Sequence, residues 1–290
     1  MSNSSERLVL VTGGTGTQGG ATVKHLLETK RTRIRVLTRS PDSPKAQRLA
    51  SLGVELMAGD MDDAPSLRKA LHNVSAAFSV QQWTDKGGVA AEERRGKAFA
   101  DAVKAENVPF LVYASAEGVE RESGLAHYES KWAVERHIRG LGLSRTILRP
   151  VGFMDTLAVN AFVRGVMLGL FRTALGNSKR VQLVAASDIG WFAARALEDP
   201  ARYAGREIPL AGDELSVPEF VATYKQVTGR AAWVAPIPKF LPKLALPEEY
   251  GAMFTWIGEQ GFKADIGALR QEHPTMMTFV AWLRASEVRS

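Results

Sequence analysis

The stretch LVLVTGGTGTQGGATVKHLL, from Leu8 to Leu27, decides what fold to expect. It begins as a continuous apolar run, passes through five glycines and continues as a helix-like segment. A continuous apolar run is typical of a parallel strand that is covered on both faces. Each glycine costs conformational entropy on folding, so this many in one turn indicate that something approaches the backbone closely.

The glycines of this turn fit two overlapping patterns, Gly14-x-Gly16-x-x-Gly19 and Gly13-x-x-Gly16-x-x-Gly19. Either pattern follows a predicted strand and opens a predicted helix over 19–29, which is the context of a dinucleotide site. Without side chains the turn lets a pyrophosphate reach the main chain, and the free N–H groups of the helix start favour an anion. The alternative is a tight turn that only lets strand and helix pack closely.

Strand-like and helix-like segments alternate up to about Pro150. The predicted strands are RLVLVT, TRIRVLTR, VELMAGD, AAFSV, PFLVYAS and SRTILRP. Such an alternation implies right-handed crossovers and a doubly wound parallel sheet of the Rossmann type, an α/β fold. We predict a dinucleotide-binding domain over 1–150 and a smaller, mostly helical α+β region over 151–290 packed against it. That boundary is approximate, and strands of the second region are free to return to the sheet.

Several polar residues are predicted to begin helices. In the second region, DTLAVNAFVRGVMLG is predicted to be one helical run, and REIPLAG a strand. Side-chain oxygens of Ser and Asp accept hydrogen bonds from the free N–H groups of a first helical turn, and a Ser–Glu pair three residues apart forms a capping box. The predicted caps are Ser43, Asp62 or Asp63, Asp188, and the Ser216–Glu219 box.

The composition is that of a globular protein, with 290 residues, 45% hydrophobic and 23% charged. The absence of cysteine excludes disulfides, a thiolate nucleophile and zinc–thiolate sites. His72, His137 and His273 are dispersed without metal-ligand spacing, so no metal is predicted. The first residues, MSNSSER, do not resemble a signal peptide, and no apolar run is long enough for a membrane span. We expect a cytoplasmic protein without a membrane partner.

The net charge of +6 raises the hypothesis of a nucleic-acid partner. The basic residues are scattered, however, apart from one dense patch between Lys30 and Arg39. Zinc-finger spacing, a basic zipper and an aromatic-rich RNA-binding signature are all missing from the sequence. A solvated basic surface is therefore the favoured interpretation.

The choice of dinucleotide is expected to be made at the end of the second strand, in VLTRSPDSPK. An NAD site usually places a carboxylate there for the ribose 2′-hydroxyl, whereas an NADP site uses arginine. This chain has Arg39 and no carboxylate before Asp42, which favours NADP(H) over NAD(H). Thr38, Ser40 and Lys45 are possible additional ligands of the 2′-phosphate. The alternative is that Arg39 is an ordinary surface residue.

The segments VTGGTGTQGG, VLTRSP, GVELMAGDMDD, HYESKWAVERHI and TILRPVGFMDTL together resemble the NmrA-like family, an atypical branch of the short-chain dehydrogenase/reductases. The resemblance covers nearly the whole first domain and is weaker after about residue 175. It implies a Rossmann fold that holds NADP(H) at the ends of the strands. The implied cofactor-binding residues are Gly13, Thr15, Gly16, Thr17, Gln18, Gly19, Arg39, Asp60, Met61, Val80, Gln81, Lys131, Pro150, Val151 and Phe153.

The same resemblance bears on catalysis. Ordinary short-chain dehydrogenases use a Tyr-x-x-x-Lys pair on the helix that here contains Lys131, together with a serine to which Ser115 could correspond. Four residues before Lys131 stands His127 instead of tyrosine, and Tyr128 is displaced by about 100° around a helix. Lys131 either binds the cofactor ribose, the favoured role, or assists proton transfer. His127 is either a proton donor or, as favoured, a packing residue, so the catalytic residues stay open among these four.

Two functions remain. The first is an NADPH-dependent reductase of a small, flat acceptor such as a quinone, enone or dye, because delocalised anions need little help from a positioned acid. The second is a catalytically silent sensor of the NADPH/NADP ratio that regulates a protein partner, which requires unequal affinity or conformation with the two redox forms. Both are compatible with a monomer or a homodimer.

Overall fold

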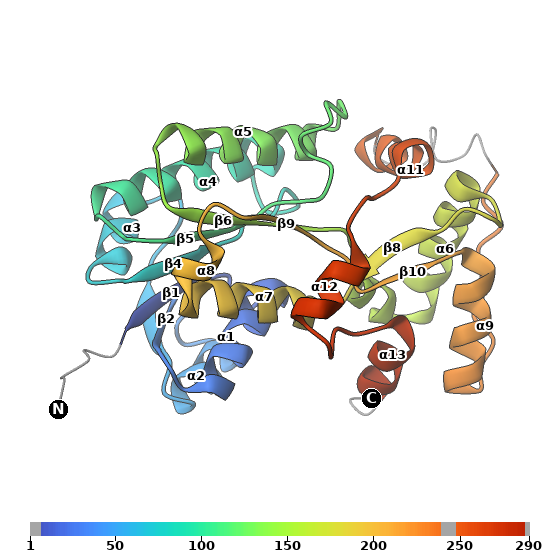
Figure 1. The fold of residues 1–290 in the computed structure, drawn as a ribbon, viewed down its shortest axis with the longest axis horizontal. Coiled ribbons are helices and arrows are strands. Elements are labelled where there is room, and N and C mark those ends of the chain that lie inside the picture. The colour runs from blue at the N-terminus through green and yellow to red at the C-terminus, as the bar shows by residue number, and fades with distance from the viewer. Residues whose placement is uncertain (1–6, 239–247, 288–290) are drawn as a thin grey trace. The chain divides into compact units, whose positions relative to one another are not determined.

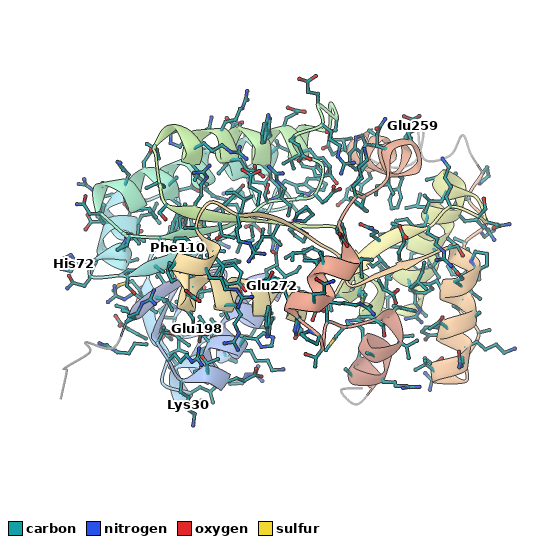
Figure 2. All side chains as sticks on the ribbon, in the orientation of Figure 1. Lys30, His72, Phe110, Glu198, Glu259 and Glu272 are labelled. Atoms are coloured by element: carbon teal, nitrogen blue, oxygen red, sulfur yellow. The ribbon has the colours of Figure 1, made fainter. Side chains whose placement is uncertain are left out.

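A computed structural model describes residues 7–238 and 248–287 of the chain. Its helices and strands are shown in Figure 1, and its side chains are drawn in the same orientation in Figure 2. No helix within these residues is long and apolar enough to cross a membrane. The strands are β1 (Leu8–Thr12), β2 (Arg33–Thr38), β3 (Glu55–Ala58), β4 (Ala76–Ser79), β5 (Leu111–Ala114), β6 (Arg145–Pro150), β7 (Gly152–Phe153), β8 (Val181–Val184), β9 (Glu207–Leu210) and β10 (Asp213–Leu215).

The α-helices alternate with the strands in the first half of the chain and predominate in the second. The first five are α1 (Thr17–Thr29), α2 (Pro44–Ser51), α3 (Ala64–Leu71), α4 (Gly88–Ala105) and α5 (Ala126–Gly140). The others are α6 (Ala161–Leu175), α7 (Ala186–Glu198), α8 (Pro200–Tyr203), α9 (Val217–Thr228), α11 (Glu248–Gln260), α12 (Ile266–Glu272) and α13 (Phe279–Glu287).

Seven strands form one sheet in the order β3-β2-β1-β4-β5-β6-β9. The pairs from β3 to β6 are parallel, and β1 has β2 on one side and β4 on the other. In Figure 1, α3, α4 and α5 lie on one face of this sheet, and α1, α2 and α7 lie on the other. The structure thus confirms the predicted doubly wound, Rossmann-type α/β fold, in which the strand order reverses between β1 and β4.

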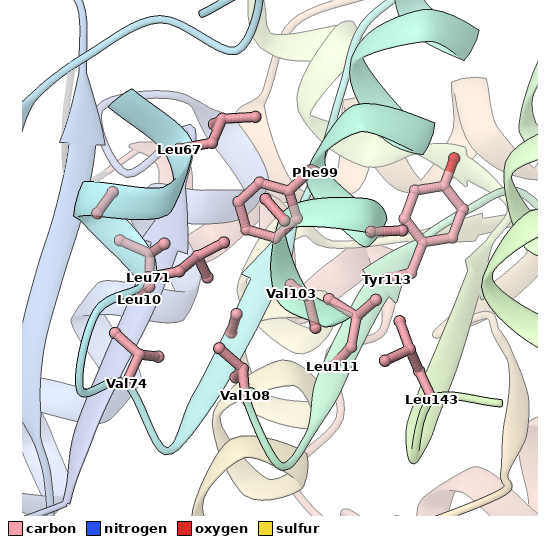
Figure 3. Close-up of a cluster of buried hydrophobic side chains, with 14 of the residues drawn as sticks. Leu10, Leu67, Leu71, Val74, Phe99, Val103, Val108, Leu111, Tyr113 and Leu143 are labelled. Carbon is pink, nitrogen blue, oxygen red and sulfur yellow. The ribbon is translucent and has the colours of Figure 1, made fainter. Parts of the chain in front are cut away.

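A cluster of buried hydrophobic side chains lies between the strands and the helices α3, α4 and α5 (Figure 3). Leu10 of β1, Leu111 of β5 and Ile147 of β6 meet Leu71 of α3 and Phe99 of α4, all with 0% exposure. Burial of such a side chain contributes about 1.5–3 kcal/mol relative to leaving it in water. The apolar runs of the sequence therefore become central strands because both faces of the sheet are covered.

The chain forms two compact units. Unit 1 comprises Met1–Val119, His127–Arg149 and Ile189–Ile208, and unit 2 comprises Glu120–Ala126, Pro150–Asp188 and Pro209–Ser290. Unit 2 contains a small sheet in the order β10-β8-β7. Its own core joins Met154 and Leu168 to Phe220 and Phe279, whose rings lie 4.2 Å apart. The domain division predicted at residue 150 stays a prediction, and the segment 189–208 is grouped with unit 1.

Two predicted caps are present as expected. The Ser43 hydroxyl accepts a hydrogen bond from the Ala46 N–H at the start of α2. At the start of α9, the Ser216 hydroxyl accepts from the Glu219 N–H, and the Glu219 carboxylate accepts from the Ser216 N–H at 2.8 Å. All three bonds satisfy N–H groups at a helix start that have no partner within the helix.

Other local predictions are wrong. Asp188 is not the N-cap of α7 but lies in its first turn, and Asp155 accepts from the Ala186 N–H instead. Asp188 binds the Met277 N–H and His273, two partners far along the chain that the sequence could not indicate. The single helix predicted over 155–169 is divided into a 3-10 helix, Met154–Ala158, and α6, because Asn160 caps α6.

The predicted acidic cap of α3 is only partly right. Asp63 occupies the N-cap position of α3 but its side chain makes no capping bond, while Asp62 pairs with Arg94 and Arg95. At the glycine turn, α1 begins at Thr17 and not at Gly19. The expectation for the first residues, 1–6, lies outside the described residues.

Close packing of α7 on α1 generates a stability prediction. A Cβ at Gly190 would lie 2.4 Å from the Ala21 carbonyl carbon and 2.6 Å from its Cβ, so Gly190→Ala forces the two helices apart. We expect it to lower the free energy of unfolding by about 1–3 kcal/mol, measured by urea denaturation. Gly140→Ala is the matched control, since a Cβ there meets nothing within 4 Å. Equal stability of both variants would contradict this packing.

Candidate functional site

The carboxyl ends of β1, β2, β3 and β4 surround a cavity of about 320 Å³ in unit 1. It lies where the strand order reverses, which is where open α/β sheets bind ligands. Its volume falls within the range of ligand pockets, about 300–1,000 Å³. The residues lining it are Thr12, Gly13, Thr15, Gly16, Thr17, Gln18, Gly19, Leu37, Thr38, Arg39, Ser40, Ser43, Gly59, Asp60, Met61, Val80, Gln81, Gln82, Asp85 and Arg95.

The glycine turn forms one wall of this cavity. The Gly16 N–H donates to the Gly13 carbonyl at 2.8 Å, and Gly13 has φ +63°, a left-handed conformation that favours glycine. A Cβ on Gly19 would lie 2.4 Å from the Gly13 oxygen, so the helix start and the turn touch through bare backbone. The first N–H groups of α1, from Thr17 on, have no partner within the helix. The turn therefore offers a pyrophosphate an approach to the main chain.

The structure distinguishes the two glycine patterns. Gly13, Gly16 and Gly19 all line the cavity, whereas Gly14 is buried and does not line it. A Cβ on Gly14 would lie 2.7 Å from the Val36 side chain of β2. Gly14 thus serves the packing of the turn on the sheet, as the alternative interpretation proposed for the whole turn, and the other three bound the cavity.

A hydrogen bond between strands fixes the opposite wall. The Thr12 hydroxyl at the end of β1 accepts from the Val80 N–H at 2.9 Å, which ties the loop after β4 to the glycine turn. This loop carries Gln81, whose Nε2 donates to the Ser79 hydroxyl at 2.8 Å. The Oε1 atoms of Gln81 and Gln18 are buried with no hydrogen-bond partner among the described residues. Two such acceptors in one lining leave room for a polar ligand, because buried polar atoms are normally paired.

Two guanidinium groups line the cavity, and they differ in their partners. Arg95 forms two hydrogen bonds to the Asp62 carboxylate, at 2.6 and 3.0 Å. Arg39, at the end of β2, is exposed and forms no ion pair within the described part of the chain. An uncommitted guanidinium can bind a phosphate in a bidentate manner. Arg39 is therefore the group available for an anionic ligand.

Most of the predicted cofactor residues meet at this cavity. From Gly13 to Gln81, each of those named by the resemblance lines it, together with Thr38 and Ser40, while Lys45 does not. Lys131 of α5 is next to the lining, since its Nζ lies 3.5 Å from the Gln81 carbonyl oxygen. Pro150, Val151 and Phe153 belong to unit 2, so their part in binding stays a prediction.

The four candidate catalytic residues are largely buried in unit 1. Ser115 follows β5 directly with 3% exposure, and its hydroxyl has no partner among the described residues. The ring of His127 stacks on Trp83 at 5.1 Å and meets the Tyr128 ring edge-on at 4.8 Å. His127 and Tyr128 are each 5% exposed. These ring contacts match the packing role favoured for His127, and the catalytic assignments stay predictions.

The structure adds cavity residues that the sequence analysis did not name. Gln82 and Asp85 follow β4, and Arg95 reaches the cavity from the second turn of α4. Arg95 had no recognisable signal, because it lies in a run of charged residues that is typical of a solvated helix face. Its hydrogen bonds to Asp62, in the loop after β3, direct it inward.

A model of the NmrA-like family matches residues 5–280, nearly the whole chain. The chain belongs to the NmrA-like family. The match confirms the resemblance that was drawn from the glycine turn and the later segments. The match also extends beyond residue 175, where the sequence resembles the family less clearly.

Three relatives illustrate what this NmrA-like protein is similar to. The NmrA-like family domain-containing oxidoreductase malD of Malbranchea aurantiaca is 29% identical over 255 residues, 79% of this chain and 75% of the relative. The NADPH-dependent quinone oxidoreductase QOR2 of Escherichia coli, solved with NADPH, has a TM-score of 0.78 at 21% identity, covering 97% and 99% of the two chains. NmrA, a negative transcriptional regulator solved with NADP, has a TM-score of 0.76 at 17% identity, covering 96% and 94%. The last two share the fold.

The lining fits a dinucleotide on its own geometry. A Cβ at Gly13 would be strained by the φ of +63° and lie 3.0 Å from Val80, and one at Gly19 would clash with the Gly13 carbonyl, so the turn keeps its bare main chain. The orphaned oxygens of Gln18 and Gln81 can accept from hydroxyl or amino groups. Arg39, which forms no ion pair among the described residues, supplies a cation in the same lining.

The ion pair at the cavity rim generates a prediction about pH. Hydrogen bonds from Arg95 and Arg94 lower the pKa of Asp62 from its ordinary 3.8 to about 2. The pairing of the ionised Asp62 carboxylate therefore contributes its full stabilisation above the pKa of Asp62 in the unfolded chain. This stabilisation is lost as the pH falls toward 2. Asp62 is 36% exposed, so we expect Asp62→Asn to cost less than about 1 kcal/mol at pH 7. The difference in unfolding free energy from wild type should narrow below pH 4; a constant difference down to pH 2.5 would contradict the pairing.

Proposed function

We propose that this NmrA-like protein binds NADP(H) in the cavity of unit 1 and reduces a small, flat acceptor of the quinone or enone class. The observation that carries the cofactor assignment is the uncommitted Arg39 in the lining of the glycine-turn cavity. Its guanidinium would bind the 2′-phosphate, with Thr38 and Ser40 beside it, and a carboxylate at this position would repel that phosphate.

Each part of the cavity has a role in this proposal. The N–H groups at the start of α1 would bind the pyrophosphate, since a helix N-terminus favours an anion. Asp60, Met61 and Arg95 would surround the adenosine half, and Gln81 and Lys131 would contact the nicotinamide ribose. When bound, the cofactor supplies a hydride. The protein's own contribution is then to orient the dinucleotide so that the hydride leaves toward the acceptor.

The acceptor class is argued from the helix that contains Lys131. The position of the usual tyrosine is occupied by His127, which stacks on Trp83 and is 5% exposed. A quinone or enone spreads the negative charge that develops on hydride addition, so water or one weak acid is sufficient as a proton source. An isolated alcohol or ketone would need a positioned acid of matched pKa.

A second candidate is a sensor of the NADPH/NADP ratio that acts on a protein partner. The burial of His127 and Tyr128 favours it, because a sensor needs a cofactor site but no exposed proton donor. The same fold occurs in NmrA, a negative transcriptional regulator that was solved with NADP, which supports a regulatory role as a candidate. A sensor must distinguish the two redox forms. Equal affinities for NADPH and NADP in calorimetry, with no difference in conformation, would count against it.

The reductase proposal predicts turnover with flat acceptors. Stopped-flow absorbance at the NADPH band, with a panel of benzoquinones, naphthoquinones and enones, should show oxidation faster than the uncatalysed rate for at least one compound. A panel of simple ketones and alcohols is the control and should show none. Binding of NADPH without any turnover would reject the reductase and leave the sensor.

The cofactor proposal predicts a change of preference in Arg39→Asp. We expect its NADPH affinity to fall by about 10–100-fold, since a bidentate charged contact is replaced by repulsion, while NADH binds as well as or better than in wild type. The measurement is titration of the intrinsic fluorescence. Arg31→Asp is the matched control, because Arg31 is exposed before the amino end of β2 and does not line the cavity. An unchanged coenzyme preference in Arg39→Asp would contradict the proposal.

A further inference from the structure

A buried carboxylate lies at a core position of α4. The inward-facing residues of this helix include Glu92, Gly96, Phe99 and Val103, whose spacing of three or four is that of an apolar helix face. Three of them are small or apolar, but Glu92 is charged and has 0% exposure. Burying a carboxylate is costly unless it is paired, so this position requires a specific partner.

The partners of Glu92 are two consecutive residues of α5. Its Oε1 lies 2.9 Å from the Lys131 Nζ, and its Oε2 accepts a hydrogen bond from the Ser130 hydroxyl at 2.5 Å. Gly96 permits this approach, because a Cβ there would lie 2.6 Å from Val134 of α5. The close packing of α4 on α5 thus brings the Glu92 carboxylate against the Lys131 ammonium group.

The ammonium group is held from two directions. The Glu92 carboxylate lies on one side of the Lys131 Nζ. The Gln81 carbonyl oxygen, on the loop that lines the cavity, lies 3.5 Å from the same Nζ. The Glu92 Oε1 atom is paired with the ammonium by charge but has no hydrogen-bond partner among the described residues. An ammonium has three N–H donors and only one is directed at the Gln81 carbonyl, so N–H groups remain for a ligand. Lys131 is 11% exposed, so little of its side chain is left to move freely in solvent.

The same carboxylate acts on a neighbouring phenol. Tyr113 of β5 is fully buried, and burial followed by the negative charges of Glu92 and Glu135 raises the pKa of Tyr113 well above its ordinary value. The phenol therefore stays protonated and is not a base. The negative charge of Glu92 is matched by Lys131 alone among its ion-pair partners in the described residues.

We propose that Glu92 is a positioning residue: its charge fixes the Lys131 ammonium beside Gln81 so that a remaining N–H is presented to the nicotinamide ribose. This inference rests on the proposed binding of NADP(H). The inference also limits the way in which Lys131 can act on the cofactor. Because its charge is compensated by Glu92, the lysine acts by a directed hydrogen bond more than by long-range attraction of phosphates.

The alternative is a purely structural pair that joins two helices. Glu135 of α5 provides the comparison, since it is also 0% exposed and is bound by Arg149 and Arg139 at 2.7 Å. That cluster also includes Glu207, and none of its members lines the cavity. Glu135→Gln therefore perturbs a buried ion pair of unit 1 away from the ligand.

The test is a double-mutant cycle of Glu92→Gln and Lys131→Met on the full-length protein, with two ligands. NADPH spans the whole site, whereas adenosine 2′,5′-bisphosphate occupies only the adenosine half. We expect Glu92→Gln to weaken NADPH by about tenfold and the bisphosphate by less than about twofold. In the Lys131→Met background it should weaken NADPH by less than about twofold further, because the lysine that it positions is gone.

Two controls separate this role from general damage. Glu135→Gln should leave the affinities for both ligands unchanged even where it lowers the melting temperature. Ser130→Ala removes the hydroxyl that donates to Glu92 and to the His127 carbonyl within α5. It should weaken NADPH by about two- to threefold, which keeps the test usable if Glu92→Gln does not fold.

Each other outcome overturns the inference in a recognisable way. Equal weakening of both ligands by Glu92→Gln, or additive effects in the cycle, would show a structural pair only. Wild-type affinity for NADPH in Glu92→Gln would show that Lys131 does not depend on it. Failure of the wild-type protein to bind either ligand would instead overturn the proposed function, on which the inference depends.

Discussion

The close approach of bare backbone at the first β–α turn is the constraint on which the site depends. Gly19 of α1 lies so near the Gly13 carbonyl that a single Cβ would come within 2.4 Å of it. This contact brings the start of α1 against the end of β1. The Thr12–Val80 hydrogen bond then fixes the loop after β4 opposite the turn. A cavity between the bare main chain of the turn and the loop that carries Gln81 follows from these two contacts.

Much of the fold could be predicted because local patterns and tertiary structure agree. The apolar runs of β1 and β5 become central strands, and Ser43 and Ser216 cap helices through contacts three residues away. The predictions that failed concern side chains with distant partners. Asp188 resembles an N-cap, but its bonds go to His273 and to the main chain of Met277, about 85 residues later. The spacing of residues along the sequence does not indicate such a contact.

The candidate site shows the same division. The glycine turn and Arg39 were predictable, because motif and neighbouring strand lie within one β–α–β unit. Arg95 and Glu92 were not, although both are on α4. Each resembles a solvated helix residue until Asp62 and Lys131 approach from other elements. The sequence signal that was available for Glu92 is its place among residues spaced as a buried helix face, a pattern in which a carboxylate is out of place unless it is paired.

The central claim is that an uncommitted guanidinium at the end of β2 selects the cofactor with the 2′-phosphate. Calorimetric titration of the wild-type protein with NADPH and NADH, at two salt concentrations, tests it most directly. The account predicts that NADPH binds at least about tenfold more tightly and that this ratio decreases at high salt, because an exposed charge pair is screened. Equal affinity for the two cofactors, or a ratio that salt does not change, would contradict it.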